Sequence, residues 1–169
     1  LAIGDAHGWQ TLPETRSNQI LALAEDPEGN LWVGHLPSRD RAFPLSVRPK
    51  GTRRLLPLSL PGIVPQGTAV VSLMAEGDTV WLGTNRLGLM RAVRHGAALQ
   101  DCVPVPIPSW PADAFVACLA GDGRGGLWVG GSAGLAHWNG RAWTTLNQAS
   151  GLPDDSVLSI AALPNSEAW

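Results

Sequence analysis

The sequence lacks several features that mark common classes of protein. It has no tyrosine, two phenylalanines and two cysteines among 169 residues, and its net charge is only −2. The absence of a basic surplus gives no indication of a nucleic-acid partner. No apolar run is long enough to span a bilayer, and no basic-then-apolar signal peptide opens the chain. Two cysteines do not make a disulfide framework, and we expect Cys102 and Cys118 to stay unbonded.

Glycine, proline and tryptophan are abundant instead. The chain holds 20 glycines, 14 prolines and eight tryptophans. Turn signals recur every eight to twelve residues, which is typical of an all-β chain built from hairpins. No stretch has a convincing helical period.

A turn followed by a tryptophan recurs along the chain. "EDPEGNLWVG" (25–34) is repeated as "GDGRGGLWVG" (121–130) and, more loosely, as "EGDTVWLGT" (76–84). Each copy follows a strand-like segment, and the copies are about 40–50 residues apart, which is typical of propeller blades. The aligned strands are 20–25, 70–75, 116–121 and 157–162, and the aligned tryptophans are Trp32, Trp81, Trp128 and Trp169.

Each unit is interpreted as four antiparallel strands, A to D. "DPEG" (26–29) has the preferences of a type I turn between strands A and B. The third strand-A position is always small, as the crowded centre of a propeller requires, and the strand-B tryptophan is expected to fill the wedge between blades. The small residues are Ala22, Ser72, Cys118 and Ser159.

The predicted fold is a β-propeller fragment of four-stranded antiparallel blades. Residues 1–12 align with 135–146, which places Trp9 on Trp143 and makes 1–14 a C–D half blade. Residues 35–65 lack the expected repeat pattern, so that blade is irregular or carries an insertion. The full division is a half blade at 1–14, blades at 15–64, 65–110 and 111–150, and an A–B half blade at 151–169. A truncated larger propeller is the preferred interpretation, and a small propeller closed by the two halves is the alternative.

The small-residue strand, "EDPEGNLWVG" and "GLPDDSV" (151–157) together resemble the two-component regulator propeller repeat. The resemblance implies an extracytoplasmic, periplasmic sensor region of a bacterial hybrid histidine kinase or related signalling protein. It also implies a membrane span and a kinase or diguanylate cyclase output in other parts of the protein. The chain would then be connected to a membrane only through those other parts.

No catalytic residue, metal site or cofactor is predicted. The four histidines, His7, His35, His95 and His137, have no metal-binding spacing. The acidic turns are expected to hold their own backbone amides, and "GDGRGG" (121–126) is expected to be a hairpin turn because no helix follows it.

Candidate ligand-binding residues lie in the predicted B–C and D–A loops, which form the channel mouth of a propeller. Arg86 follows strand B directly, and its planar guanidinium suits carboxylates or sugar hydroxyls; pairing with a rim carboxylate is the competing interpretation. Trp110 is either a stacking surface or a cap on the core. The complete set is Arg86, Asn85, Trp110, His35, Arg16 and Asp113.

The sequence therefore predicts a ligand-sensing or protein-interaction propeller whose ligand is an unidentified small molecule or oligosaccharide. Two alternatives stay open: a propeller enzyme of lyase or glycosidase type, and a plain interaction scaffold. Self-association is also expected, because the flat faces of end blades would expose apolar surface.

Overall fold

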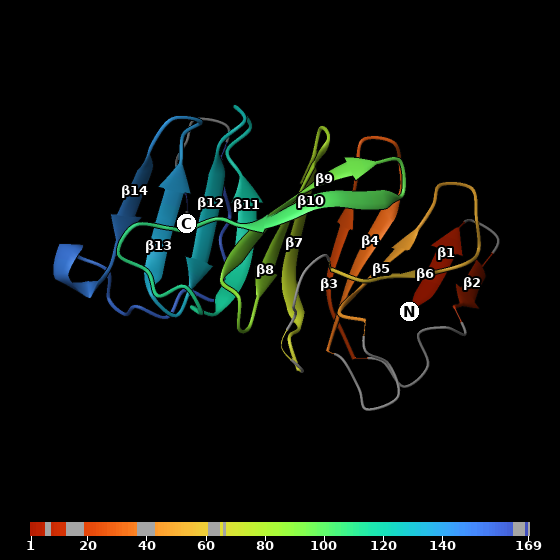
Figure 1. Cartoon of the computed structure of the whole chain (residues 1–169), viewed down its shortest axis with the longest axis horizontal. Coiled ribbons are helices and arrows are strands. Elements are labelled where there is room, and N and C mark those ends of the chain that lie inside the picture. Colours follow the sequence, from red (N-terminus) through yellow and green to blue (C-terminus); the bar gives the residue numbers. More distant parts are fainter. Residues whose placement is uncertain are drawn as a thin grey trace.

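The computed structural model describes residues 1–5, 8–12, 19–36, 43–60, 65, 67–163 and 168. These residues form an almost purely β structure, with one short 3-10 helix at Gln148–Ser150. Figure 1 shows three sheets side by side, with the N-terminal hairpin beyond one of them. The hairpin consists of β1 (Ala2–Asp5) and β2 (Gly8–Thr11).

Each sheet has four antiparallel strands that are neighbours in the order of the chain. The first sheet contains β3 (Gln19–Glu25), β4 (Leu31–Leu36), β5 (Leu45–Arg48) and β6 (Leu56–Leu58). The second contains β7 (Val70–Glu76), β8 (Thr79–Thr84), β9 (Leu89–His95) and β10 (Ala98–Pro104). The third contains β11 (Val116–Gly121), β12 (Leu127–Gly131), β13 (Gly134–Trp138) and β14 (Trp143–Leu146).

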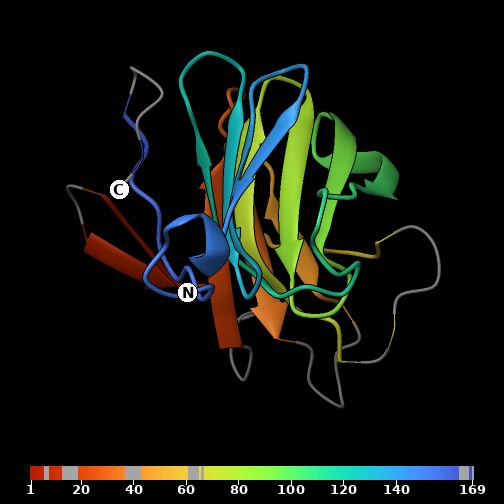
Figure 2. The ribbon, with the colours of Figure 1, turned by 90° about the vertical axis from the view of Figure 1, so that its left-hand side faces the viewer.

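The first strands of the three sheets lie next to one another. β7 contacts β3 on one side and β11 on the other, whereas the fourth strands lie at the outer edges. Figure 2 looks along the row from the β14 side, with the third sheet in front of the others. This arrangement is an arc of three consecutive β-propeller blades, and it confirms the predicted fold class.

Strand pairing repeats in the same register from blade to blade. Each first strand has a β-bulge at the same place in the aligned repeat, at Ile20/Ala22, Val70/Ser72 and Val116/Cys118. The tryptophan pairs in each case with the residue two places after the bulge, as Ala24↔Trp32, Met74↔Trp81 and Ala120↔Trp128. The repeat alignment is therefore confirmed for the three complete blades.

A glycine of the second strand lies opposite each small first-strand residue. These interblade glycines are Gly34, Gly83 and Gly130, paired with Ala22, Ser72 and Cys118. A Cβ on Gly34 would lie 2.5 Å from the carbonyl oxygen of Val70, and one on Gly83 would lie 2.7 Å from that of Val116. Both oxygens belong to the next blade, so neighbouring blades approach each other closely at this position.

The strand-B tryptophans fill the space between blades farther from the centre. Trp32 is fully buried among Leu45 and Val47 of its own blade and Val70, Val80 and Leu82 of the next. Trp81 packs in the same way against the core shared by the second and third blades. Strands β8 and β12 thus present apolar residues to the preceding blade at alternate positions. The tryptophan of each strand lies between two of these residues and faces the opposite side.

Both chain ends continue the repeat in part. β1 and β2 pair as Ala2↔Thr11 and Gly4↔Trp9, the same register as Ala136↔Thr145 and Trp138↔Trp143 between β13 and β14. The hairpin therefore has the register of a C–D pair, and its Trp9 is largely exposed. The prediction of an innermost strand at 157–162 is wrong, because these residues lie outside the named strands.

The C-terminal segment nevertheless follows the third blade. Val157 donates its amide to the Gly131 carbonyl, and Ala162 forms an isolated bridge with Ala168. That bridge occupies the place of Glu25↔Leu31 in the first blade. Trp169 lies outside the described residues, so its predicted place in a second strand is not addressed.

The first blade keeps four strands although its sequence departs from the repeat. β5 pairs with β4 through Trp32↔Val47, and β6 completes the sheet through Val47↔Leu56. The departures fall in the connections, since the β5–β6 loop spans 49–55 whereas the equivalent turn of the second blade is only 96–97. Insertion in loops, rather than loss of a strand, explains the irregular pattern.

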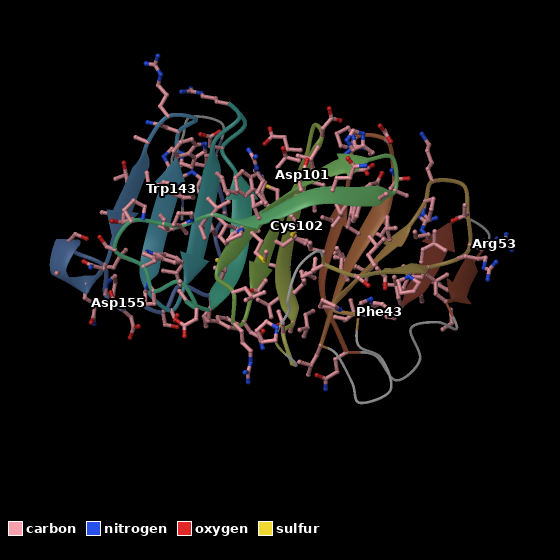
Figure 3. All side chains as sticks on the ribbon, viewed as in Figure 1. Phe43, Arg53, Asp101, Cys102, Trp143 and Asp155 are labelled. Atoms are coloured by element: carbon pink, nitrogen blue, oxygen red, sulfur yellow. The ribbon has the colours of Figure 1, made fainter. Side chains whose placement is uncertain are left out.

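Cys102 and Cys118 are both free, as predicted. Cys102 lies on the outer strand β10, next to Asp101 at a bulge where Asp101 has φ 48° (Figure 3). Cys118 lies on the inner strand β11 of the next blade. Burial raises the pKa of the Cys102 thiol to about 11, so this thiol stays protonated at neutral pH.

Substituting an interblade glycine tests the close approach of the blades. Gly83→Ala would press its Cβ against Ser72 Oγ and the Val116 carbonyl, whereas Gly121→Ala would meet only the Met74 side chain, whose Sδ lies at 3.4 Å. We expect Gly83→Ala to lower the free energy of unfolding by about 1–3 kcal/mol and Gly121→Ala to change it much less. Chemical denaturation of both variants measures the difference, and equal losses would contradict the account.

Candidate functional site

The B–C turn of the second blade is rigid. It begins where β8 ends, at Thr84, whose side chain donates to the Gly88 carbonyl at 2.9 Å and accepts from the Leu87 amide at 2.8 Å. The Thr84 amide also donates to the Gly88 carbonyl. One buried threonine therefore closes a turn of four residues, 85–88, on which two predicted site residues lie.

Asn85 joins this turn to the preceding D–A loop. Its Oδ1 accepts from the Ala69 amide at 2.7 Å, and its Nδ2 donates to the Gly67 carbonyl at 3.2 Å. The side chain thus has both polar ends engaged within the protein. Asn85 acts here as a loop-positioning residue rather than as a group that is open to a ligand.

Arg86 has the opposite character. Its side chain is exposed at the tip of the same turn. Among the described residues Arg86 forms no ion pair, so the rim carboxylate of the competing interpretation is not found there. A fixed backbone therefore presents an unpaired guanidinium at this end of the blades.

The D–A loop between β10 and β11 lies against this turn. A Cβ on Gly88 would approach the Ala112 carbonyl to 2.8 Å, so the two loops are in contact. Asp113 is exposed on the loop. Trp110 is half-buried against the core around Leu89 and Ile107, and its buried Nε1 has no hydrogen-bond partner among the described residues. This position favours the core-capping interpretation of Trp110.

His35 and Arg16 complete the predicted set. His35 lies within β4 rather than in a loop, is only 1% exposed, and its Nε2 lies 2.9 Å from Ser46 Oγ. It is therefore part of the interior of the first blade. Arg16 lies outside the described residues. The structure thus brings together the loops that carry Asn85, Arg86, Trp110 and Asp113, with His35 buried elsewhere.

The A–B turns lie at the opposite end of the blades, where buried side chains form several hydrogen bonds and ion pairs. Asp26 is buried, and its Oδ1 accepts from the amides of Glu28 and Asn30. Its Oδ2 accepts from Asn30 Nδ2 and from Trp32 Nε1 at 3.0 Å. The Gly29 amide donates to the Asp26 carbonyl, which closes the predicted turn. The acidic turn is thus structural, as predicted.

Arg94 ties this turn to the second blade. Its side chain is 3% exposed, its Nε donates to the Gly77 carbonyl, and its guanidinium lies 3.0 Å from Glu28 and 3.6 Å from Asp26. Burial acts to raise the pKa of Asp26, but hydrogen bonds from Asn30 and Trp32 and the charge of Arg94 outweigh it and lower that pKa. Sequence reasoning missed Arg94, because no repeat motif marks it.

Two further findings concern metal-binding clusters and membrane-spanning helices. Within the described ranges, no group of three or more His, Cys, Asp or Glu side chains is arranged to hold a metal ion. The same residues include no helix with the length and apolar character needed to cross a membrane.

The family comparison matches the first blade. Residues 16–36 match the family described as "Two component regulator propeller". The matched stretch covers β3, the Asp26 turn and the whole of β4, which include residues on which the sequence resemblance also rests. The comparison with curated protein sequences gives no match.

Solved structures share the fold at low sequence identity. The extracellular domain of the putative one component system BT4673 from B. thetaiotaomicron matches with a TM-score of 0.67 and 18% identity over 96% of this chain. That of the putative hybrid two component system BT3049 from the same organism gives 0.62 and 17% over 85%. "YCF48 bound to D1 peptide" gives 0.60 and 16% over 86%.

The chain spans only part of these proteins. It covers 22% of the BT4673 domain, 20% of the BT3049 domain and 45% of YCF48. The likeness therefore establishes the propeller fold of this stretch, and the activity of a whole protein is a separate matter.

Removing the charge of Asp26 tests the structural role of the acidic turn. In Asp26→Asn, an amide NH₂ would face the donors of Asn30 and Trp32, so we expect the free energy of unfolding to fall by about 2–3 kcal/mol. The exposed Asp101→Asn is the matched control, with a change within about 0.5 kcal/mol.

The acid dependence of the same variant provides a second readout. Because the pKa of folded Asp26 lies below its ordinary value near 3.9, its stabilisation is complete above about pH 4 and is lost as pH falls through the folded pKa. Denaturation curves at several acidic pH values should show a shallower loss for Asp26→Asn than for the native chain. An unchanged acid profile would contradict the assignment.

Proposed function

We propose that this chain is part of the sensor region of a bacterial signal-transduction protein and that it binds a ligand at the mouth formed by its B–C and D–A loops. The regulator-propeller match at 16–36 and the two extracellular signalling domains of the same fold support this proposal. Those neighbours also support an extracytoplasmic, periplasmic location. A kinase or diguanylate cyclase output would lie in other parts of the protein.

The exposed guanidinium of Arg86 is the single observation that carries the proposal. The Thr84 and Asn85 hydrogen bonds fix the turn beneath it, so little conformational entropy of the backbone is lost on binding. A planar guanidinium donates two parallel hydrogen bonds to a carboxylate or to adjacent sugar hydroxyls. The ligand we favour is therefore a small molecule or oligosaccharide with an acidic or hydroxyl-rich group.

The positions of the acidic side chains among the described residues support a role in binding rather than in catalysis. The two carboxyl groups with lowered pKa, Asp26 and Asp122, lie in A–B turns at the end away from the mouth, where backbone amides occupy them. A lyase or glycosidase would need acid and base groups with perturbed titration at the mouth. We therefore propose a binding module and keep the propeller enzyme as the alternative.

A peptide-binding scaffold is the second candidate. The neighbour YCF48 is a structure with a bound peptide, which supports this alternative for a chain of the same fold. Arg86 would then pair with an acidic side chain or a C-terminal carboxylate of the peptide. We also propose self-association, since Leu21 and Leu23 of β3 are 41% and 49% exposed and alternate with Ala24, which packs on the core shared with the second blade.

Arg86→Gln tests the mouth directly. Arg91→Gln is the matched control, because Arg91 is also exposed but lies on strand β9 rather than in a mouth loop. The probes are neutral oligosaccharides, uronic-acid oligosaccharides and short acidic peptides, screened by their effect on the melting temperature. A ligand present at 100 times its dissociation constant stabilises the folded state by about 2.7 kcal/mol.

We expect at least one probe class to raise the melting temperature of the native chain and of Arg91→Gln. Arg86→Gln should keep the native melting temperature without ligand and lose most of the shift, with affinity reduced about tenfold or more. An equal shift in all three proteins would remove Arg86 from the site. A response to peptides alone would favour the scaffold.

A further inference from the structure

The first and third blades contain the same aspartate turn. Asp122 is buried like Asp26, and its Oδ1 accepts from the amides of Arg124 and Gly126 at 2.8 and 2.7 Å. Asp26 Oδ1 accepts from two amides at equivalent places. The Oδ1 atom of each aspartate therefore accepts hydrogen bonds from the same two backbone positions of its turn.

The second carboxylate oxygen has different partners. In the first blade, Asp26 Oδ2 accepts from Trp32 Nε1 at 3.0 Å. In the third blade, Asp122 Oδ2 lies 3.1 Å from His137 Nε2, and Trp128 Nε1 is buried with no partner among the described residues. A carboxylate only accepts, so the histidine donates to the oxygen that the tryptophan uses in the other blade.

Strand register explains the exchange. Val47 lies opposite Trp32 on the third strand of the first blade, and His137 occupies the same place opposite Trp128. Valine has no donor, so Trp32 reaches its aspartate without competition. The His137 ring stacks on Trp128 with centroids 4.0 Å apart and an angle of 17°, and its Nε2 points at Asp122.

Few other charges surround this cluster. His137 and Asp122 side chains are 16% and 4% exposed, and β11, β12, β13 and β14 carry no other titratable group than Cys118 and His137. Arg124 and Arg141 lie exposed in the adjoining A–B and C–D turns, and Asp155 contacts the other end of β13 through its carbonyl. Asp122 is therefore the charged partner of His137.

The cluster also lies on the side of the third blade that the following segment covers. Gly130 is two residues from Trp128 on β12, so it points to the same face, and a Cβ on it would meet Val157 at 2.6 Å and Ile160 at 3.1 Å. In the first blade, the equivalent Trp32 packs against the next blade. A movement of Trp128 would therefore change the surface on which the segment at 157–162 packs.

We propose that His137 is a pH-sensitive switch in which protonation of its ring decides whether Asp122 Oδ2 bonds to the histidine or to Trp128. The charged imidazole holds the oxygen by a charge-assisted hydrogen bond and gains attraction from the indole face beneath it. A neutral ring makes neither the charge-assisted hydrogen bond nor the cation–π contact. Trp128 Nε1 then takes the oxygen, as Trp32 does, because this relieves a buried donor without a partner.

The direction of the switch follows from the charge that each partner carries. Burial acts to raise the pKa of Asp122, but hydrogen bonds from Arg124, Gly126 and His137 outweigh it and lower that pKa. The carboxylate therefore stays charged while imidazole groups titrate between about pH 5 and 8. The charge-assisted hydrogen bond exists only while the His137 ring carries its proton, so protonation favours the histidine as partner of Asp122 and loss of the proton favours Trp128.

The indole N–H signal of Trp128 in ¹⁵N-labelled chain reports which donor holds Asp122. Trp128→Phe assigns the signal, and spectra are recorded from pH 5 to pH 8. In the native chain we expect protection of this N–H from exchange with solvent, corrected for intrinsic rates, to rise about tenfold toward pH 8. His95→Gln, which removes an exposed histidine of the second blade, should leave this response unchanged.

Two substitutions of His137 separate the switch from general pH effects. His137→Val copies the first blade, so its Trp128 signal should show the protected, hydrogen-bonded state at every pH. His137→Gln keeps a neutral side chain in place, so its signal should not respond to pH. A native signal that is constant from pH 5 to 8, or an equal response in His137→Gln, would overturn the proposal, and the glutamine variant decides it even where the valine variant fails to fold.

Discussion

The close approach of one blade to a glycine of the preceding blade is the constraint on which the rest of the structure depends. Ser72 Oγ donates to the Val116 carbonyl at 3.0 Å, and Cys118 Sγ makes a weaker contact of 3.8 Å with the Val157 carbonyl. The Val116 carbonyl belongs to the first strand of the next blade, β11, and the Val157 carbonyl belongs to the segment that follows the third blade. A larger residue at either position, or a Cβ on the interblade glycines, would hold the strands apart.

Distance from this contact determines what each part of a blade must contain. Blades diverge outward from their first strands, so a small residue suits the inner strand and a tryptophan suits the second, where Trp32 is fully buried. The A–B turns add a polar link between blades through Asp26, Glu28 and Arg94. Among the described residues Arg86 at the mouth end makes no such ion pair, and the proposed binding site lies there.

Sequence reasoning predicted what each repeat specifies locally. Strand order, the tight turn at 26–29 and the pairing of Trp32, Trp81 and Trp128 follow from patterns within single units. It did not predict Arg94, because the partners of that side chain belong to two blades. It also placed His35 in a loop, although the residue extends β4 by pairing with Ile20 and is buried beside Ser46.

Departures between repeats carry as much information as their similarity. Val47 and His137 occupy one register position, yet only the histidine removes the aspartate from its tryptophan. The segment at 157–162 has a first-strand sequence but forms no ladder. A strand requires a hydrogen-bonded neighbour along its length, and the described residues provide only the hydrogen bond from Val157 to Gly131 and the Ala162 bridge. A pattern predicts which residues can form a strand, whereas pairing depends on the partner.

Nuclear Overhauser effects between the interblade glycines and the next blade test the central claim most directly. The account predicts strong effects from the α-protons of Gly34, Gly83 and Gly130 to the γ-methyl groups of Val70, Val116 and Val157, whose Cγ1 atoms lie within 3.1 Å of the Cβ positions. Three such contacts in the folded chain would establish the repeated close approach. Their absence while the sheets themselves remain folded would contradict it.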